Sequence, residues 1–284
     1  MYICVGGACM KIHYEITGDI TKPTLLLIHG LGWTQKIWNE VQEALKEDLQ
    51  LILIDLPGHG ESEATNEYDL EVIADMIHRE IALIPVSNLY VAGSSLGAAV
   101  ALAYGRKYNA NGVILIDGGF TALNRIEGLH AEDMIYNPLP AYAFESMDAY
   151  FRFMRSDNPD LWNDYIATAV ADQLFLDPKE GVYKQKASSA IQQKYLESLY
   201  YFDPLDALGR LSDTKKITVM VALHEQQQKA DVEEDLLAFY NVHRNTDILY
   251  YEDTDHLIML DKPKRFIEDV KRIIHNGKSS GIAD

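Results

Sequence analysis

The stretch Leu89–Gly105, LYVAGSSLGAAVALAYG, decides the fold of this chain of 284 residues. Its first part predicts a strand that ends at Gly93, and its second part predicts a helix that begins at about Leu96. The turn between them reads GSSLG, a G-x-S-x-G pattern centred on Ser95. In such a turn the serine is held in a strained conformation, and small residues two before and two after it let the backbones pass closely. Ser95 is therefore the candidate nucleophile, at a helix N-terminus that favours developing negative charge.

Short apolar runs recur on both sides of this stretch. Their continuous apolarity is typical of strands buried on both faces of a parallel sheet, and the alternating run Ile12–Thr17 predicts an antiparallel edge strand. The buried strands are expected at Thr24–His29, Leu51–Asp55, Leu89–Gly93, Val113–Asp117, Thr218–Leu223 and Asp247–Tyr251. Helices, from apolar spacing of about 3.6 residues, are expected at Lys36–Lys46, Tyr68–Ile84, Leu96–Tyr108, Val232–Val242 and Pro263–Ile274. This alternation predicts an α/β fold with a mostly parallel central sheet flanked by helices.

One segment, from Phe120 to about Asp206, contains no run of the buried-strand type. Its clearest pattern is the helix-like DLWNDYIATAVADQLF at Asp160–Phe175. We expect a core domain at 10–119 and 207–276, with residues 120–206 inserted as a helical cap over the carboxyl edge of the sheet. The segment is rich in aromatic residues, most of which should form the interior of the cap while a few face a pocket: Tyr136, Tyr142, Phe144, Tyr150, Phe151, Phe153, Trp162, Tyr165 and Phe175.

The composition limits the classes of partner. The chain has 25 Lys+Arg against 43 Asp+Glu, a net charge of −18, so nucleic acid and anionic membranes are not expected as partners. No stretch approaches the ~18 apolar residues of a membrane span, and Cys4 and Cys9 do not make a disulfide framework or a metal site. We expect a cytoplasmic protein that acts on a small molecule, with residues 1–9 as an extension. The sequence leaves the oligomeric state open, a homodimer included.

Two further motifs contain candidate catalytic groups. His29 and Gly30, in LLLIHGLGW, form a turn after a parallel strand, so the backbone N–H of Leu31 can point at the pocket. Together with the N–H of Leu96, it would supply the two donors that an oxyanion needs. His256, in YYEDTDHLIMLDKP, follows the last strand and can reach back to Ser95 as general base. His59, in the glycine-rich loop DLPGHGES, is expected to have a structural role.

The motifs IHGLGW, IDLPGHGES, GSSLG and DTDHLIMLDKP, in this order, resemble those of the α/β-hydrolase superfamily, in its capped esterase and lipase-like branch. The resemblance spans about Ile12 to Ile274 and is weakest in the cap. It implies an α/β-hydrolase fold, a nucleophilic serine, an acyl-enzyme intermediate and no cofactor or metal. Relatives that act on epoxides or halides use a carboxylate nucleophile at the turn, so Ser95 argues against those chemistries.

The third catalytic residue should be a carboxylate that orients the imidazole of His256. Most members of the family place it after the strand equivalent to Thr218–Leu223, where this chain has the glutamines of VALHEQQQKAD. Asp117, in VILIDGGF, follows the preceding strand and is our first candidate. Glu225 is the alternative acid, nearest the customary place. Asp231 is the third candidate, but it lies further on and would need a long loop, so we expect it to cap the helix that follows.

The sequence therefore predicts a serine hydrolase that cleaves a carboxylic ester or thioester through an acyl-enzyme, with Ser95, His256 and Asp117 as catalytic residues. The aromatic cap favours a mostly apolar substrate. Two alternatives stay open. One is a non-hydrolytic enzyme of the same fold, such as a lyase of the menaquinone-pathway type. The other is a ligand-binding pseudoenzyme, in which a missing acid would be tolerated.

Overall fold

The computed structural model describes residues 11–156, 161–223 and 226–276. Cys4, Cys9 and the alternative acid Glu225 lie outside these ranges. Within them, no helix is long and apolar enough to cross a membrane.

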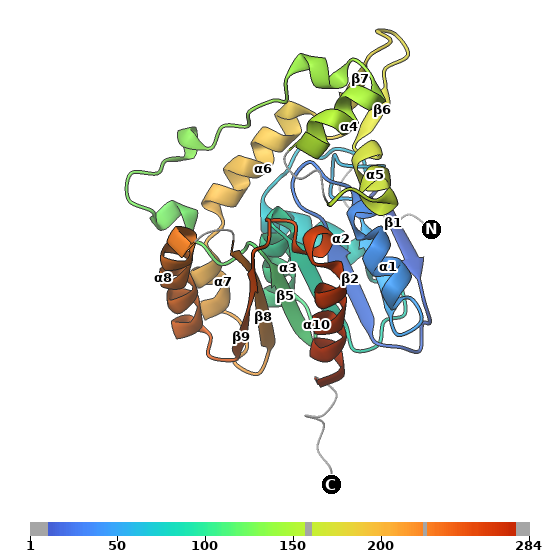
Figure 1. Ribbon diagram of the computed structural model, residues 1–284. Helices are drawn as coiled ribbons and strands as arrows, with labels where there is room; N and C mark the ends of the chain where they lie inside the picture. The colour runs from blue at the N-terminus through green and yellow to red at the C-terminus, as the bar shows by residue number, and fades with distance from the viewer. Residues whose placement is uncertain (1–10, 157–160, 224–225, 277–284) are drawn as a thin grey trace.

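Seven strands of the described chain form one central sheet in the order β1-β3-β2-β4-β5-β8-β9 (Figure 1). The strands are β1 (Tyr14–Thr17), β2 (Thr24–Ile28), β3 (Gln50–Ile54), β4 (Tyr90–Ser94), β5 (Gly112–Ile116), β8 (Lys216–Leu223) and β9 (Thr246–Glu252). The edge strand β1 pairs with β3 in the antiparallel sense, and all other neighbours are parallel. The sheet thus confirms the mostly parallel α/β architecture, with the antiparallel edge near Ile12–Thr17.

The inner strands are apolar throughout because helices cover both faces of the sheet. In β2, Leu26 and Ile28 face one buried cluster while Leu25 and Leu27 face the other, as the two-residue period of a strand requires. The first cluster receives apolar side chains of α2 (Leu70–Ile81), α3 (Leu96–Lys107), α7 (Pro204–Gly209) and α8 (Gln226–Val242). The second receives those of η1 (Gln35–Trp38), α1 (Asn39–Leu45), α9 (Ile258–Asp261) and α10 (Pro263–Asn276). Figure 1 shows α1 and α10 on the near face of the sheet.

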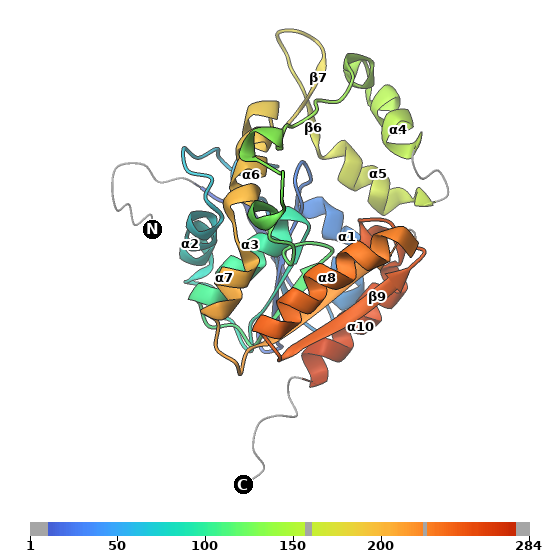
Figure 2. The same cartoon turned by 90° about the vertical axis from the view of Figure 1, so that its left-hand side faces the viewer.

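The segment between β5 and α7, called the cap below, rises above the sheet (Figure 2). Its helical elements are η2 (Leu123–Arg125), η3 (Ala131–Asp133), η4 (Ala141–Phe144), α4 (Met147–Ser156), α5 (Asp164–Ala171) and α6 (Ser189–Tyr201). It also contains an antiparallel ribbon of β6 (Leu174–Leu176) and β7 (Tyr183–Gln185), which the expectation of a purely helical cap did not include. Strands of three residues are too short for the two-residue alternation of apolar and polar side chains to be recognised in the sequence. Because α7 crosses residue 207 and packs against α3 and α8, the domain boundaries stay a prediction.

The start of α8 corrects one expectation. The helix begins at Gln226, so the glutamines at 226–228 belong to it, and Asp231 lies inside the helix and not at its N-cap. Glutamine is a good helix former, and the polar composition of this turn concealed a helix start. The interpretation of Asp231 as a capping residue is therefore wrong.

Candidate active site

The turn at Ser95 joins the end of β4 to the start of α3. Ser95 has φ 55° and ψ −118°, a region that non-glycine residues rarely occupy. A Cβ on Gly93 would lie 1.9 Å from the carbonyl oxygen of Gly97, and a Cβ on Gly97 would lie 2.5 Å from the carbonyl oxygen of Ile28. Both positions therefore require glycine, and together they let α3 start directly above the end of β4. The backbone N–H of Ser95 donates to the carbonyl oxygen of Ile116 at 2.9 Å, which ties the turn to the next strand.

Asp117 follows β5 and contacts His256. The Nδ1 atom of His256 lies 2.6 Å from Oδ2 of Asp117. The other carboxylate oxygen, Oδ1, accepts the backbone N–H of Ala222 at 2.9 Å, so both oxygens are engaged. Because a carboxylate only accepts, Nδ1 of His256 carries the hydrogen and Nε2 has a free lone pair. The structure thus joins the two residues that the sequence selected as base and first-choice acid.

The backbone after Asp117 passes directly beside Ser95. A Cβ on Gly118 would lie 2.7 Å from the carbonyl oxygen of Ser95 and 2.8 Å from its Cα. Asp117 itself has φ 45°, so the chain turns sharply at the end of β5. In the described part of the chain, no hydrogen bond joins the side chains of Ser95 and His256. Catalytic hydrogen bonds of this kind often form only when substrate is bound.

The turn after β2 contains Leu31, one of the two expected oxyanion donors. A Cβ on Gly30 would lie 3.3 Å from Cβ of Ser95, so the turn that contains Leu31 lies against the serine. The carbonyl oxygen of Gly30 is 2.7 Å from Nδ1 of His29. In a trans peptide the N–H points opposite to the carbonyl, so the N–H of Leu31 points away from His29. Among the described residues, neither this N–H nor that of Leu96 has a hydrogen-bond acceptor.

Two buried histidines fix the shape of this turn. His29 accepts the N–H of Leu56 on Nε2 at 2.9 Å, which leaves Nδ1 to donate to Gly30. His59 accepts the N–H of Gly32 on Nε2 at 3.1 Å, and its ring centroid lies 5.2 Å from that of His29. Burial lowers the pKa of both imidazoles, that of His59 to about 3. Both rings are therefore neutral, and each can accept a backbone N–H. The structural role expected for His59 agrees with these contacts.

Helix α6 of the cap covers the same turn from above. Gly32 has φ 75°, and a Cβ there would lie 2.9 Å from Oε1 of Gln192. The hydroxyl of Tyr195 donates to the carbonyl oxygen of Pro57 at 3.1 Å, and its ring packs edge-on against His59. These contacts join residues more than 130 positions apart in the chain, and the sequence analysis did not find them.

A cavity of about 520 Å³ opens between the cap and His256. Its walls include Trp33, which follows the turn that contains Leu31, and Met154 and Trp162 from the cap. The rest of the lining consists of aliphatic and acidic side chains, Leu161, Ile166, Val170, Leu257, Leu260, Asp255 and Asp261. Trp162 is thus one of the expected pocket-facing aromatic residues. Tyr150 is instead fully buried within the cap, where its hydroxyl bonds Gln173.

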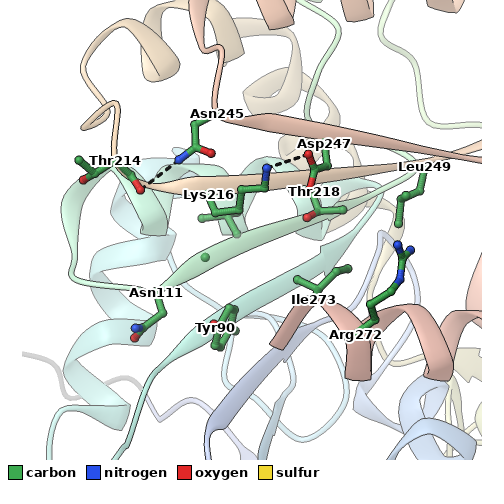
Figure 3. Close-up of a pocket in the computed structure, with 12 residues that line it drawn as sticks. Tyr90, Asn111, Thr214, Lys216, Thr218, Asn245, Asp247, Leu249, Arg272 and Ile273 are labelled. Carbon is green, nitrogen blue, oxygen red and sulfur yellow. Dashed lines mark hydrogen bonds and ion pairs between the residues drawn. The ribbon is translucent and has the colours of Figure 1, made fainter. Parts of the chain in front are cut away.

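A second cavity, of about 400 Å³, lies at the opposite end of the sheet (Figure 3). It is bordered by the first residues of β4, β5 and β8, Tyr90, Gly112 and Lys216. Its charged groups are already engaged, for example in the 2.7 Å ion pair between Lys216 and Asp247. Parallel sheets bind ligands at the carboxyl ends of their strands, where Ser95, Asp117 and His256 lie. The cavity beside His256 is therefore the candidate site.

Comparison with known proteins shows which families and structures this chain resembles. A model described as "Alpha/beta hydrolase family" matches residues 25–269. The chain is 25% identical over 269 residues to Lipase 3 of Moraxella sp. (strain TA144), covering 92% of this chain and 80% of the lipase. It is 30% identical over 157 residues to Lipase 1 of Psychrobacter immobilis, covering 53% of this chain and about half (49%) of that lipase.

A similar fold occurs in the crystal structure of E-2-(acetamidomethylene)succinate hydrolase. The TM-score is 0.76 and the sequence identity 19%, over 94% of this chain and 96% of that chain. Identity this low supports the fold and not the substrate.

Proposed function

Because the chain belongs to the alpha/beta hydrolase family, we propose that it is a serine hydrolase of carboxylic esters or thioesters. In this proposal Ser95 is the nucleophile, His256 the general base and Asp117 the acid of the triad. The backbone N–H groups of Leu31 and Leu96 form the oxyanion hole. The similarity to two lipases supports the reaction class at the level of the family.

One observation carries the proposal. His256 contacts Asp117 at 2.6 Å, and the residue after Asp117 lies against Ser95 in its strained turn. The side chain of His256 is 55% exposed and lies beside a cavity whose lining is mostly apolar. An exposed imidazole held in one tautomer and orientation by a carboxylate is what a general base requires.

The reaction would proceed in two stages. Nε2 of His256 takes the proton of Ser95 as Oγ attacks the substrate carbonyl carbon, and the oxyanion is held by the N–H groups of Leu31 and Leu96. The intermediate collapses, the carbonyl–heteroatom bond breaks, and His256 gives its proton to the leaving alkoxide or thiolate. A water then loses a proton to His256 and attacks the acyl-enzyme, and the acid leaves as Ser95 recovers its proton.

Labelling with a fluorophosphonate tests the nucleophile. We expect stoichiometric modification of Ser95, located by peptide mass spectrometry, and none in Ser95→Ala. A folded protein that takes up no label would overturn the proposal and favour a ligand-binding pseudoenzyme.

A panel of p-nitrophenyl esters with acyl chains of varied length tests the reaction class. We expect release of p-nitrophenolate that depends on Ser95. A protein that is labelled by the fluorophosphonate but cleaves no ester would point to the non-hydrolytic alternative, a lyase of the same fold.

A further inference from the structure

The cavity beside His256 has a particular distribution of charge. Two carboxylates, Asp255 and Asp261, are among the residues that line it, and the described lining contains no lysine or arginine. The lysine next in sequence to Asp261, Lys262, holds its Nζ 3.5 Å from an oxygen of that carboxylate. The net charge of −18 adds a general negative field. Among the described residues that line the cavity, an anionic group of a substrate would therefore meet no cationic side chain of lysine or arginine.

The position of the cavity relates it to the reacting carbonyl. Trp33, which lies two residues after Leu31 in the chain, and His256 both line the cavity. A carbonyl bound by the N–H of Leu31 and close to His256 would therefore send one of its substituents into the cavity. Met154 and Trp162 of the cap also line it, so this substituent would be enclosed mostly by apolar surface.

We infer that the site accepts esters whose acyl chain is uncharged and apolar and rejects those whose chain ends in a carboxylate; this rests on the proposed function. An apolar chain gains about fourfold in kcat/KM for each methylene that enters the cavity, from the transfer free energy of a CH₂ group. A carboxylate at the same depth would lose its hydration without gaining a cation. Burial of an unpaired ion is costly enough to cancel the gain from several methylenes.

A matched set of substrates tests the inference. p-Nitrophenyl hexanoate and mono-p-nitrophenyl adipate have chains of equal length and differ in a terminal methyl or carboxylate. p-Nitrophenyl 6-aminohexanoate carries a cation at the end of its acyl chain. It shows whether the site rejects a negative charge in particular or any polar end group. p-Nitrophenyl acetate has an acyl group too short to fill the cavity and reports the catalytic groups alone.

We expect kcat/KM for the hexanoate to exceed that for the adipate by about 100-fold or more, with the aminohexanoate between them. If acetate is cleaved but hexanoate and adipate differ by less than about tenfold, the inference is overturned and the proposed function stands. If acetate is not cleaved either, the proposed function falls and the inference with it.

A substitution in the cavity should reverse the preference. Met154 is half-buried in the wall, and lysine has a side chain of similar length that can place its ammonium in the cavity. We expect Met154→Lys to raise the adipate-to-hexanoate ratio of kcat/KM by about tenfold or more, as one new ion pair would. Met154→Gln, a polar and uncharged control, should leave that ratio within about threefold of wild type. Equal ratios in the two variants would contradict a selection by charge.

Discussion

The substitution Asp117→Asn tests the candidate acid most sharply, because the structure dictates which way the new amide points. Oδ1 of Asp117 accepts the backbone N–H of Ala222 at 2.9 Å, and Oδ2 faces Nδ1 of His256 at 2.6 Å. An asparagine would keep its oxygen on Ala222, since its amino group cannot accept that N–H. The amino group would then face His256 and donate to Nδ1.

This reversal moves the proton of the imidazole. With Nδ1 forced to accept, the hydrogen resides on Nε2, which can no longer take the proton of Ser95. Loss of the correct tautomer in a serine triad costs about 10⁴-fold in kcat, or about 5.5 kcal/mol of transition-state stabilisation. The substrate-binding cavity is unchanged, so KM should move little.

The assay is steady-state hydrolysis of p-nitrophenyl butyrate, with Ser95→Ala as the baseline and circular dichroism to establish folding. Glu225→Gln is the matched control, and we expect it to keep kcat within a fewfold of wild type. A folded Asp117→Asn protein that retains a tenth of its activity, together with an inactive Glu225→Gln, would refute the assignment.

Three other expectations concern the surroundings of the site. The folded-state pKa of His59, about 3, lies below its unfolded value of 6.5, so the unfolded chain binds the extra proton. The free energy of unfolding should therefore fall as the pH drops below 6.5, by roughly 3 kcal/mol at pH 4. Urea unfolding measured across this pH range should show a smaller loss of unfolding free energy in His59→Gln. In Gly97→Ala the new Cβ would lie 2.5 Å from backbone oxygen of Ile28, so we expect a loss of about 1–3 kcal/mol and a lower Tm by calorimetry; an unchanged Tm would contradict the close approach. Thr34→Val removes the 2.7 Å hydrogen bond to Asp172 that links the turn after β2 to the cap. If this turn supplies the proposed oxyanion donor Leu31, kcat should fall more than KM rises; an effect on KM alone would argue against that role of the turn.

Local sequence patterns predicted most of the core. The apolar runs predicted the strands because a strand between two helical layers has no polar face, and β2, β4 and β5 begin and end within a residue or two of the expected limits. The three-residue strands of the cap ribbon gave no signal because they are too short for a period. The start of α8 was missed because a polar first turn resembles a loop.

The sequence by itself determined the serine and the histidine as candidates, because a G-x-S-x-G turn and a histidine after the last strand are local patterns. It ranked Asp117 before Glu225 but left both open, since the two residues follow neighbouring strands whose loops meet at one edge of the sheet. Only the tertiary structure brings Asp117 to 2.6 Å from His256, while Glu225 lies outside the described residues. The composition of the cavity was likewise not predictable from the sequence. Met154 and Trp162 lie about 100 positions from Asp261 in the chain, and only the packing of the cap over the sheet brings them into the lining of one cavity.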